Sequence, residues 1–328
     1  MFSSPLEEYA AARETAACID SSFWGRIELG GQEGLDLLHR LSTNDILGLR
    51  PGDIKRTVLT SDKGRILDLV TVVALQDRLL LITSPDSEDQ VVRWIEKYTV
   101  LEDITVHRVT DESVMVSFYG PEAISACSSL LGAEASLASR VSVPWGEVLV
   151  IPIQADRQPM IHMVARREKA SEFWRWISAA TGRWPIMGVR GFELYRIATG
   201  MPIAGAELTD DYDPYDVGLM EYVNLRKGCY IGQEVISRIN TYQKVRFGLK
   251  GLLLSSFPEP LGTGRTIFAG DLEAGWMTSC APDRIRGAYP ALGVLRTDIA
   301  EGISVRIPGD GGIITGQVVS VPMEWSVA

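Results

Sequence analysis

The stretch WGRIELGGQEGLDLLHRLS at residues 24–42 recurs in outline as SVMVSFYGPEAISACSSLL at residues 113–131. In each stretch an apolar run of the kind that forms a β-strand ends at a glycine, Gly30 or Gly120. Leu or Ile side chains then recur at helical spacing, which predicts an amphipathic helix. This shared order suggests two related units; a chance match of a common strand–helix order is the alternative.

Both stretches also continue in the same order. Extended material follows at residues 56–75 after the first and at residues 140–153 after the second. A strand and a Trp-bearing helix come next, at residues 79–98 and 160–179. The strands are joined by short hairpins rather than by helical crossovers. We therefore expect two α+β units of about 80 to 90 residues with mostly antiparallel sheets.

The remainder of the chain changes character near Val245, after which short apolar runs are bounded by Gly and Pro. Such runs at regular spacing predict a small antiparallel β-barrel. The runs are FGLKGLLL (247–254), RTIFAG (265–270), EAGWMTSCA (273–281), AYPALGVLR (288–296), ISVRIP (303–308) and GGIITGQVVSV (311–321). The expected organisation is a domain at 1–244, with subdomains at 20–110 and 111–183 and a further segment at 184–244, followed by a barrel domain at 245–328.

The overall composition is that of a soluble globular protein, with 46% apolar and 23% charged residues among 328. The formal net charge of −10 gives no general attraction to nucleic acid or to anionic lipid. No run approaches about 18 apolar residues, so we expect no membrane span. The N-terminal residues lack the pattern of a signal peptide, and a reducing cytoplasm is the expected location.

The cysteines and histidines argue against a self-contained metal centre. Cys18, Cys127, Cys229 and Cys280 lie far apart and form no CxxC pair, which fits neither a zinc site nor a disulfide framework. The three histidines share no spacing suited to one metal ion. His162 lies in the strand-like run MIHMV, where a hydrogen-bonded structural histidine is the favoured interpretation.

Residues 184–244 carry the least regular pattern of the chain. IMGVRGFELYRIATG predicts a helix that ends at Gly200, and an acidic, Pro-containing loop follows at residues 201–219. The run KGCYIGQE begins at Lys227 and is glycine-rich and polar. Its Cys229 has no nearby histidine partner, so hydrolase chemistry is disfavoured. Redox or transfer chemistry at an exposed thiol and a small buried structural cysteine both stay open.

KGCYIGQE followed by Arg238 resembles the signature of the folate-binding YgfZ proteins, whose relatives act in iron–sulfur cluster biogenesis. That family is similar in fold to the T-protein of the glycine cleavage system, a tetrahydrofolate-dependent aminomethyltransferase. The resemblance extends over residues 20–45, 61–72, 196–219 and 275–296. It implies a T-protein-like folate-binding fold in which two duplicated α/β subdomains and the barrel surround a central channel.

The resemblance also implies roles for individual residues. Asp68 aligns with the T-protein aspartate beside the folate nitrogens, where an anion would stabilise a cationic iminium. Ala198 occupies the position of a T-protein glutamate that pairs with the pterin ring. Alanine cannot accept those N–H groups, so weaker binding or another acceptor is expected, with Asp216 and Glu221 as candidates.

The remaining site residues follow from their positions in the resembling segments. Asp68 and Cys229 are the expected catalytic residues. Beside Asp68, the expected folate-site residues are Asn44, Arg196, Asp216, Lys227, Tyr230, Gln233, Glu234 and Arg238. Arg196 has the alternative of pairing with Glu193, Arg238 that of pairing with Glu234, and Lys227 that of being a solvated lysine.

Three functions compete on this evidence. The favoured one is a monomeric, tetrahydrofolate-binding accessory protein that supports assembly or repair of iron–sulfur client proteins through the thiol of Cys229. The alternative is a folate-dependent aminomethyltransferase of the glycine cleavage system, supported by Asp68. The third is a non-catalytic module that has lost folate. Whether the chain is an enzyme is left open by the sequence.

Overall fold

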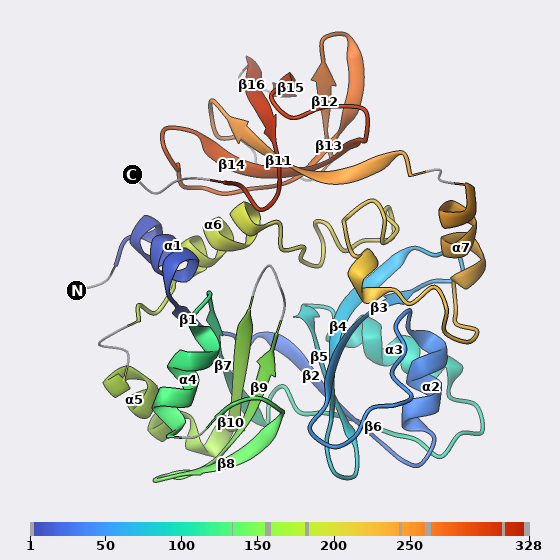
Figure 1. Ribbon diagram of the computed structural model, residues 1–328, viewed down its shortest axis with the longest axis vertical. Helices are drawn as coiled ribbons and strands as arrows, with labels where there is room; N and C mark the ends of the chain where they lie inside the picture. The colour runs from blue at the N-terminus through green and yellow to red at the C-terminus, as the bar shows by residue number, and fades with distance from the viewer. Residues whose placement is uncertain are drawn as a thin grey trace.

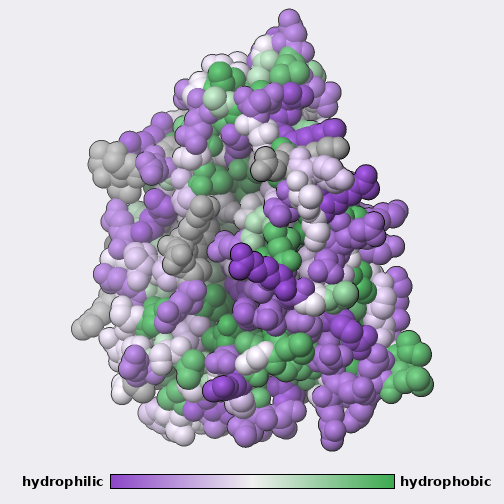
Figure 2. Space-filling view, turned by 45° about the vertical axis from the view of Figure 1, so that its right-hand side comes forward, coloured by the Kyte–Doolittle hydropathy of each residue, from purple (hydrophilic) through white to green (hydrophobic). Residues whose placement is uncertain are grey.

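The structure is a computed structural model that describes residues 3–132, 134–154, 159–180, 184–242, 245–259, 264–309 and 312–324. Two sheet-and-helix units lie side by side beneath a β-barrel (Figure 1). The surface on the face shown in Figure 2 is mostly hydrophilic, with apolar side chains exposed in small groups. Among the described residues, no helix is both long enough and apolar enough to cross a membrane.

The first unit is a five-stranded antiparallel sheet backed by two helices. Its elements are β2 (Trp24–Gly30), α2 (Gly34–Leu41), β3 (Ile54–Thr60), β4 (Ile66–Ala74), β5 (Leu79–Pro85), α3 (Glu88–Tyr98) and β6 (Thr105–Arg108). The strand order is β3-β4-β5-β2-β6. The apolar faces of α2 and α3 bury Leu37, Leu41 and Val91 against the sheet, which forms a core of its own.

The second unit repeats this plan. Its elements are β7 (Ser113–Tyr119), α4 (Ala123–Leu131), β8 (Ser139–Val143), β9 (Gly146–Ile153), β10 (Met160–Arg166), the 3-10 turn η1 (Arg167–Lys169) and α5 (Ala170–Ala180). The strand order β8-β9-β10-β7-β1 matches that of the first sheet position by position. The edge strand differs in one respect: β1 comes from the part of the chain that precedes the first unit. The predicted duplication is therefore confirmed at the level of topology.

The edge strands tie the two units to each other. β1 (Ala17–Asp20) precedes the first unit in sequence yet pairs with β7 of the second sheet. β6 is the last strand of the first unit and pairs with β2 at the edge of the first sheet. The second sheet therefore contains a strand from the start of the chain. The predicted subdomains at 20–110 and 111–183 do not include this strand in the second unit.

Two helices lie between the second sheet and the barrel. α1 (Pro5–Glu14) packs on α6 (Val189–Thr199), where Glu8 accepts a 2.9 Å hydrogen bond from the backbone N–H of Gly188 and so caps α6. α6 ends at Gly200, which adopts the left-handed conformation with φ 75°, as the sequence predicts. Figure 1 shows α6 beneath the barrel, and it contacts β14.

The barrel is closed, as expected, with the order β11-β14-β13-β12-β15-β16. Its strands are β11 (Phe247–Leu254), β12 (Arg265–Ala269), β13 (Leu272–Cys280), β14 (Tyr289–Arg296), β15 (Ser304–Gly309) and β16 (Gly312–Val319). Closure pairs both edges of the sheet, so the barrel needs no neighbour to satisfy them. Before it come the turn η2 (Met220–Tyr222) and α7 (Gln233–Tyr242).

Candidate functional site

Two cavities share part of their lining: one lies between the barrel, the first sheet unit and η2, and the other lies between the two sheet units and η2. The barrel-side cavity has a volume of about 290 Å³ and the sheet-side cavity about 530 Å³. The barrel-side cavity is lined by Arg56, Leu69, residues 199–202, residues 217–219, Glu221, Tyr222, Leu249, Lys250, Glu301 and residues 319–321. The sheet-side cavity is lined by Asn44, Leu49, residues 52–56, Ser136, Leu137, residues 152–154, Glu221 and Tyr222.

Three side chains belong to both linings and form what we call the shared wall: Arg56, Glu221 and Tyr222. Arg56 comes from β3, whereas Glu221 and Tyr222 come from η2. Segments about 165 residues apart in the chain therefore meet at the junction of the cavities. Convergence of a few polar groups in a partly apolar cavity is the usual arrangement of a small-molecule site.

The shared wall is held together by polar contacts. Arg56 Nη1 donates a 2.9 Å hydrogen bond to the Tyr222 hydroxyl, and the guanidinium carbon lies 4.8 Å from the centre of the Tyr222 ring. Burial raises the pKa of Tyr222; Arg56 opposes this shift and Glu221 adds to it. Within the part of the chain that the structure describes, the buried Nε–H of Arg56 has no hydrogen-bond partner. The guanidinium of Arg56 and the carboxylate of Glu221 thus have opposite effects on the pKa of the Tyr222 hydroxyl.

Asn44 is the expected site residue that lines one of these two cavities. Its Nδ2 donates a 2.9 Å hydrogen bond to the backbone carbonyl of Arg56, and its Oδ1 accepts one from the N–H of Asp45. Asn44 therefore holds the turn after α2 against β3. The contact is made to the backbone of Arg56, whose side chain lies in the shared wall.

Asp68 lies on the other side of the first sheet from the cavities. It pairs with Leu59 across β3 and β4, and both are fully buried beside the helix-covered core, whereas Leu69 lines the barrel-side cavity. Its two oxygens accept 2.9 Å hydrogen bonds from the N–H groups of Leu69 and Ser84. Burial raises the pKa of Asp68, although the hydrogen bonds from Ser84 and Leu69 counteract this shift. The side chain lines neither of the two cavities.

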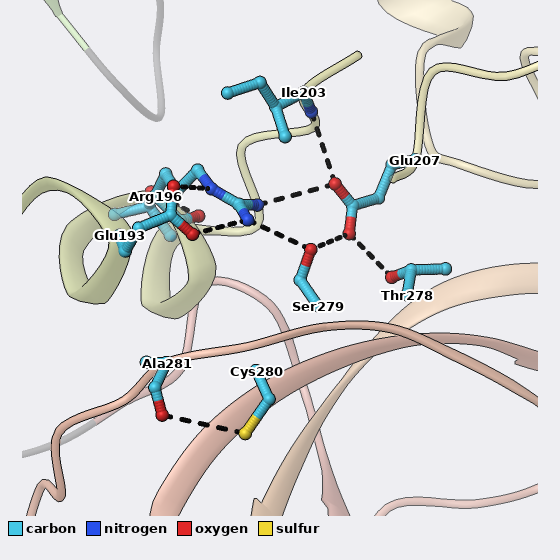
Figure 3. Close-up of polar contacts among 9 residues, drawn as sticks. Glu193, Arg196, Ile203, Glu207, Thr278, Ser279, Cys280 and Ala281 are labelled. Atoms are coloured by element: carbon cyan, nitrogen blue, oxygen red, sulfur yellow. Dashed lines mark hydrogen bonds and ion pairs between the residues drawn. The ribbon is translucent and has the colours of Figure 1, made fainter. Parts of the chain in front are cut away.

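Arg196 is buried in a charge network below the barrel (Figure 3). It pairs with Glu193 at 2.7 Å, as one alternative predicted, and with Glu207 at 3.5 Å. Burial lowers the pKa of Arg196, but Glu207 and Glu193 outweigh that effect and leave it raised. Arg196 also donates to Ser279 of β13 at 3.1 Å, so it links α6 to the barrel.

Ala198 is fully buried and is the next-to-last residue of α6. Its side chain belongs to the central apolar core, and its carbonyl accepts a 2.7 Å hydrogen bond from the N–H of Met323. The position that the resemblance assigns to a pterin-binding glutamate is therefore apolar. Ala198 does not line the barrel-side cavity, although the next residue, Thr199, does.

Asp216 lines a separate cavity of about 310 Å³ together with Arg65, Asp213 and Trp276. It accepts a 3.1 Å hydrogen bond from the N–H of Asp213 and lies 3.8 Å from Arg65. Burial, followed by the charge of Asp213, raises the pKa of Asp216 to about 6. Asp216 thus organises its loop and does not reach the shared wall.

Lys227 is buried, so the solvated alternative is wrong. Its Nζ donates to the backbone carbonyls of His39, Ser42 and Asn44 at 2.6, 2.7 and 2.8 Å. These carbonyls end α2 and begin the next turn, where a cation is favoured by the helix dipole. Burial lowers the pKa of Lys227 to about 8. Its three donors are occupied by protein.

Tyr230 is buried beside Lys227, with its ring centre 5.2 Å from the ammonium group. Burial raises the pKa of Tyr230 to about 12, and its hydroxyl has no hydrogen-bond partner among the described residues. Gln233 begins α7 and is half-buried, while Glu234 and Arg238 are exposed on that helix. Among the ion pairs of the described residues, none joins Glu234 to Arg238. None of these four residues lines the two cavities.

Cys229 is exposed, whereas the other three cysteines are buried, so the buried alternative for this thiol is wrong. The backbone on either side is anchored by Lys227 and by Ile231, whose N–H donates to Arg40 at 3.0 Å. An exposed thiol on an anchored segment is accessible to a partner. Within the described residues no group of three or more His, Cys, Asp or Glu is placed to hold a metal ion.

The sequence did not single out Arg56 or Tyr222. Arg56 begins the extended run at residues 56–75, and the signal that identifies it is a pair of cations, Lys55 and Arg56, near the start of an otherwise apolar strand. Tyr222 carries no such signal. It becomes part of the site because the loop before KGCYIGQE folds back onto β3.

Comparisons with known proteins agree with this architecture. The model of the family described as the GCVT N-terminal domain matches residues 1–227. An Arabidopsis thaliana protein whose name places it among chloroplastic transferases is 27% identical over 316 residues, which is 93% of this chain and 70% of that protein. An aminomethyltransferase of Geobacillus kaustophilus is 26% identical over 332 residues, or 98% of this chain and 90% of that one.

The likeness extends to a solved structure. The glycine cleavage system aminomethyltransferase T from Bartonella henselae superposes with a TM-score of 0.79 at 19% sequence identity. The match covers 98% of this chain and 89% of that one. At this identity the likeness concerns the fold, including the two sheet units and the closed barrel.

Proposed function

Since this chain belongs to the family of the GCVT N-terminal domain, the T-protein superfamily, we propose that it binds a tetrahydrofolate in the barrel-side and sheet-side cavities. One observation carries the proposal: the two cavities adjoin at a wall in which Arg56, Glu221 and Tyr222 converge. Two neighbouring cavities that share a wall suit an elongated ligand that has a heterocyclic ring at one end and carboxylates at the other.

A titration tests this function. We expect saturable binding of tetrahydrofolate to the purified chain, followed by calorimetry under anaerobic conditions. Ser320 lines the barrel-side cavity, so Ser320→Trp places an indole ring in that space and is expected to abolish binding. Ser125→Trp on the exposed side of α4 is the matched control and is expected to bind normally. Failure of the unaltered chain to bind would remove the proposal.

Within this function we propose that the chain is an accessory protein supporting assembly or repair of iron–sulfur proteins through Cys229. The support is the KGCYIGQE signature, the exposure of the thiol, and the anchoring of its segment by Lys227. The expected result is that Cys229→Ala folds and binds tetrahydrofolate normally yet fails to restore iron–sulfur enzyme activity in cells that lack the native protein. Full restoration by this variant would defeat the role of the thiol.

A folate-dependent aminomethyltransferase is the second candidate function. It is favoured by the similarity of 98% of the chain to an aminomethyltransferase. The enclosed position of Asp68 and the apolar Ala198 speak for the accessory role instead. An assay of folate-dependent ammonia release from an aminomethyl-lipoyl carrier decides between them. Release above the level of an Asp68→Asn variant would establish the transferase and the predicted catalytic role of Asp68.

A further inference from the structure

A folate ring needs an acceptor for its amino edge, and α6 does not supply one. Ala198 is apolar and fully buried. The acids lining the barrel-side cavity are Glu221 and Glu301, and those lining the sheet-side cavity are Glu221 and Asp53. Glu221 is therefore the acid common to both linings. Asp216 belongs to a different cavity, and its carboxylate already accepts from Asp213.

The setting of Glu221 also suits a ligand with both donors and acceptors on one edge. Glu221 and Arg56 exert opposite effects on the pKa of Tyr222, because one is an anion and the other a cation near the same hydroxyl. Glu221 is exposed to the cavities, and Arg56 retains an Nε–H without a partner. Acceptor and donor capacity are thus available together in the shared wall.

The pyrimidinone edge of a tetrahydrofolate presents an amino group and a ring N–H, both donors, next to a carbonyl acceptor. A carboxylate accepts two parallel N–H groups in a charge-assisted pair, and a guanidinium donates to a carbonyl oxygen. We propose that Glu221 accepts from the amino edge of the ring and that Arg56 donates to the ring carbonyl. This inference rests on the proposed folate binding. It assigns recognition of the pyrimidinone edge to residues of η2 and β3 instead of α6.

The contribution of Glu221 is measured with a pair of ligands and a pair of variants. The ligands are tetrahydrofolate and its 2-desamino analogue, which lacks the amino group and so lacks one of the two donors that Glu221 would recognise. Glu221→Gln is expected to weaken tetrahydrofolate binding by about tenfold or more, because a charge-assisted pair becomes a neutral one. Glu273→Gln, at an exposed acid of β13 that lines neither cavity, is expected to stay within about twofold of the unaltered chain.

The analogue isolates the contact from any structural effect. It is expected to bind the unaltered chain about tenfold more weakly than tetrahydrofolate and to lose less than tetrahydrofolate does in Glu221→Gln, since the amino contact cannot be lost twice. Equal losses for both ligands in Glu221→Gln, or no loss for tetrahydrofolate, would overturn the assignment while leaving folate binding intact. No tetrahydrofolate binding by the unaltered chain would overturn both this assignment and the proposed function.

Discussion

Glu207 shows how a single buried residue can join the barrel to the rest of the molecule. It is fully buried, and it accepts hydrogen bonds from Thr278 at 2.6 Å, Ser279 at 2.7 Å and the N–H of Ile203 at 3.2 Å (Figure 3). Arg196 supplies the opposite charge. Buried charges are tolerated when they are paired and hydrogen-bonded in this way. The contacts keep the start of the loop after α6 against β13.

Replacement of this carboxylate is expected to destabilise the fold. Glu207→Gln removes the negative charge that pairs with Arg196 in a buried site. The free energy of unfolding is therefore expected to fall by about 3 kcal/mol. Glu193→Gln is the control, because the Glu193 side chain is partly exposed and Arg196 then keeps Glu207. Urea unfolding followed by circular dichroism measures both. If Glu193→Gln lowered the free energy of unfolding as much as Glu207→Gln does, Glu207 would not be the more important partner of Arg196.

His162 is a buried histidine that is satisfied inside the second sheet, as the sequence predicts. Its Nδ1 lies 2.6 Å from the Ser117 hydroxyl, on the neighbouring strand β7. Burial lowers the pKa of His162 to about 3, and the charges of Arg56 and Arg26 act in the same direction. The neutral imidazole is therefore the form that fits the folded state.

This shift makes stability depend on pH. An unfolded chain takes up the His162 proton near the ordinary pKa of about 6.5, whereas the folded chain resists protonation until about pH 3. Stability from this group is present above pH 6.5 and falls with acidification by up to about 1.4 kcal/mol per pH unit. Urea unfolding at pH 7 and pH 5 should show a smaller decrease for His162→Gln than for the unaltered chain. Equal decreases would count against the prediction.

At the scale of elements, the KGCYIGQE segment is positioned by close backbone contacts. Thr60 donates to the carbonyl of Ile231 at 2.8 Å, which joins the segment to the end of β3. Gly232 has φ 86°, and a Cβ there would lie 2.6 Å from the Ser61 carbonyl oxygen. Glycine is required at this position by both conformation and space. The first glycine of the segment, Gly228, has open space around it.

The two glycines give a matched pair of substitutions. Gly232→Ala is expected to destabilise the chain by at least about 2 kcal/mol, because it combines left-handed strain with a backbone clash. Gly228→Ala meets nothing within 4 Å and is expected to leave unfolding unchanged within about 0.5 kcal/mol. Thermal unfolding of both variants provides the measurement. Similar effects at the two positions would show that the close approach to Ser61 does not matter.

At the scale of the whole molecule, the cavities exist because three bodies meet. The barrel supplies Leu249 and Lys250, the first sheet supplies Arg56, and η2 supplies Tyr222. An apolar cluster that includes Val58, Leu219 and Val294 packs the same three parts together. A ligand bound at this junction therefore stabilises contacts between parts that are distant in sequence.

Hydrogen exchange can detect this coupling. Tetrahydrofolate at about one hundred times its dissociation constant is expected to stabilise the folded chain by about 2.7 kcal/mol. Protection should rise together in β3, in η2 and in β11, since each lines the cavities. Ser320→Trp should show no rise with the same ligand. Protection confined to one of the three segments would place the ligand elsewhere.

Much of the fold was predictable from the sequence because hydrophobic periodicity is local. The strands from Trp24 to Gly30 and from Ser113 to Tyr119, and the barrel strands, lie where the apolar runs predict them. The pairing of β1 with the second sheet was not predictable, because a short edge strand carries little pattern and pairs across a long distance. The residues that face a cavity were harder still to predict from the sequence. Neighbouring side chains of a strand point to opposite faces of the sheet, and only the structure shows that Leu69, not Asp68, faces the barrel-side cavity.

The sequence by itself determined the duplicated α+β plan, the closed barrel and the resemblance carried by KGCYIGQE, because these depend on short-range patterns of side chains. Only the tertiary structure decided which side chains meet. It turned Lys227 onto the end of α2, enclosed Asp68, left Cys229 exposed and brought Arg56 to Tyr222. The physical reason is that burial and pairing of charges depend on contacts between remote segments, which local pattern does not encode.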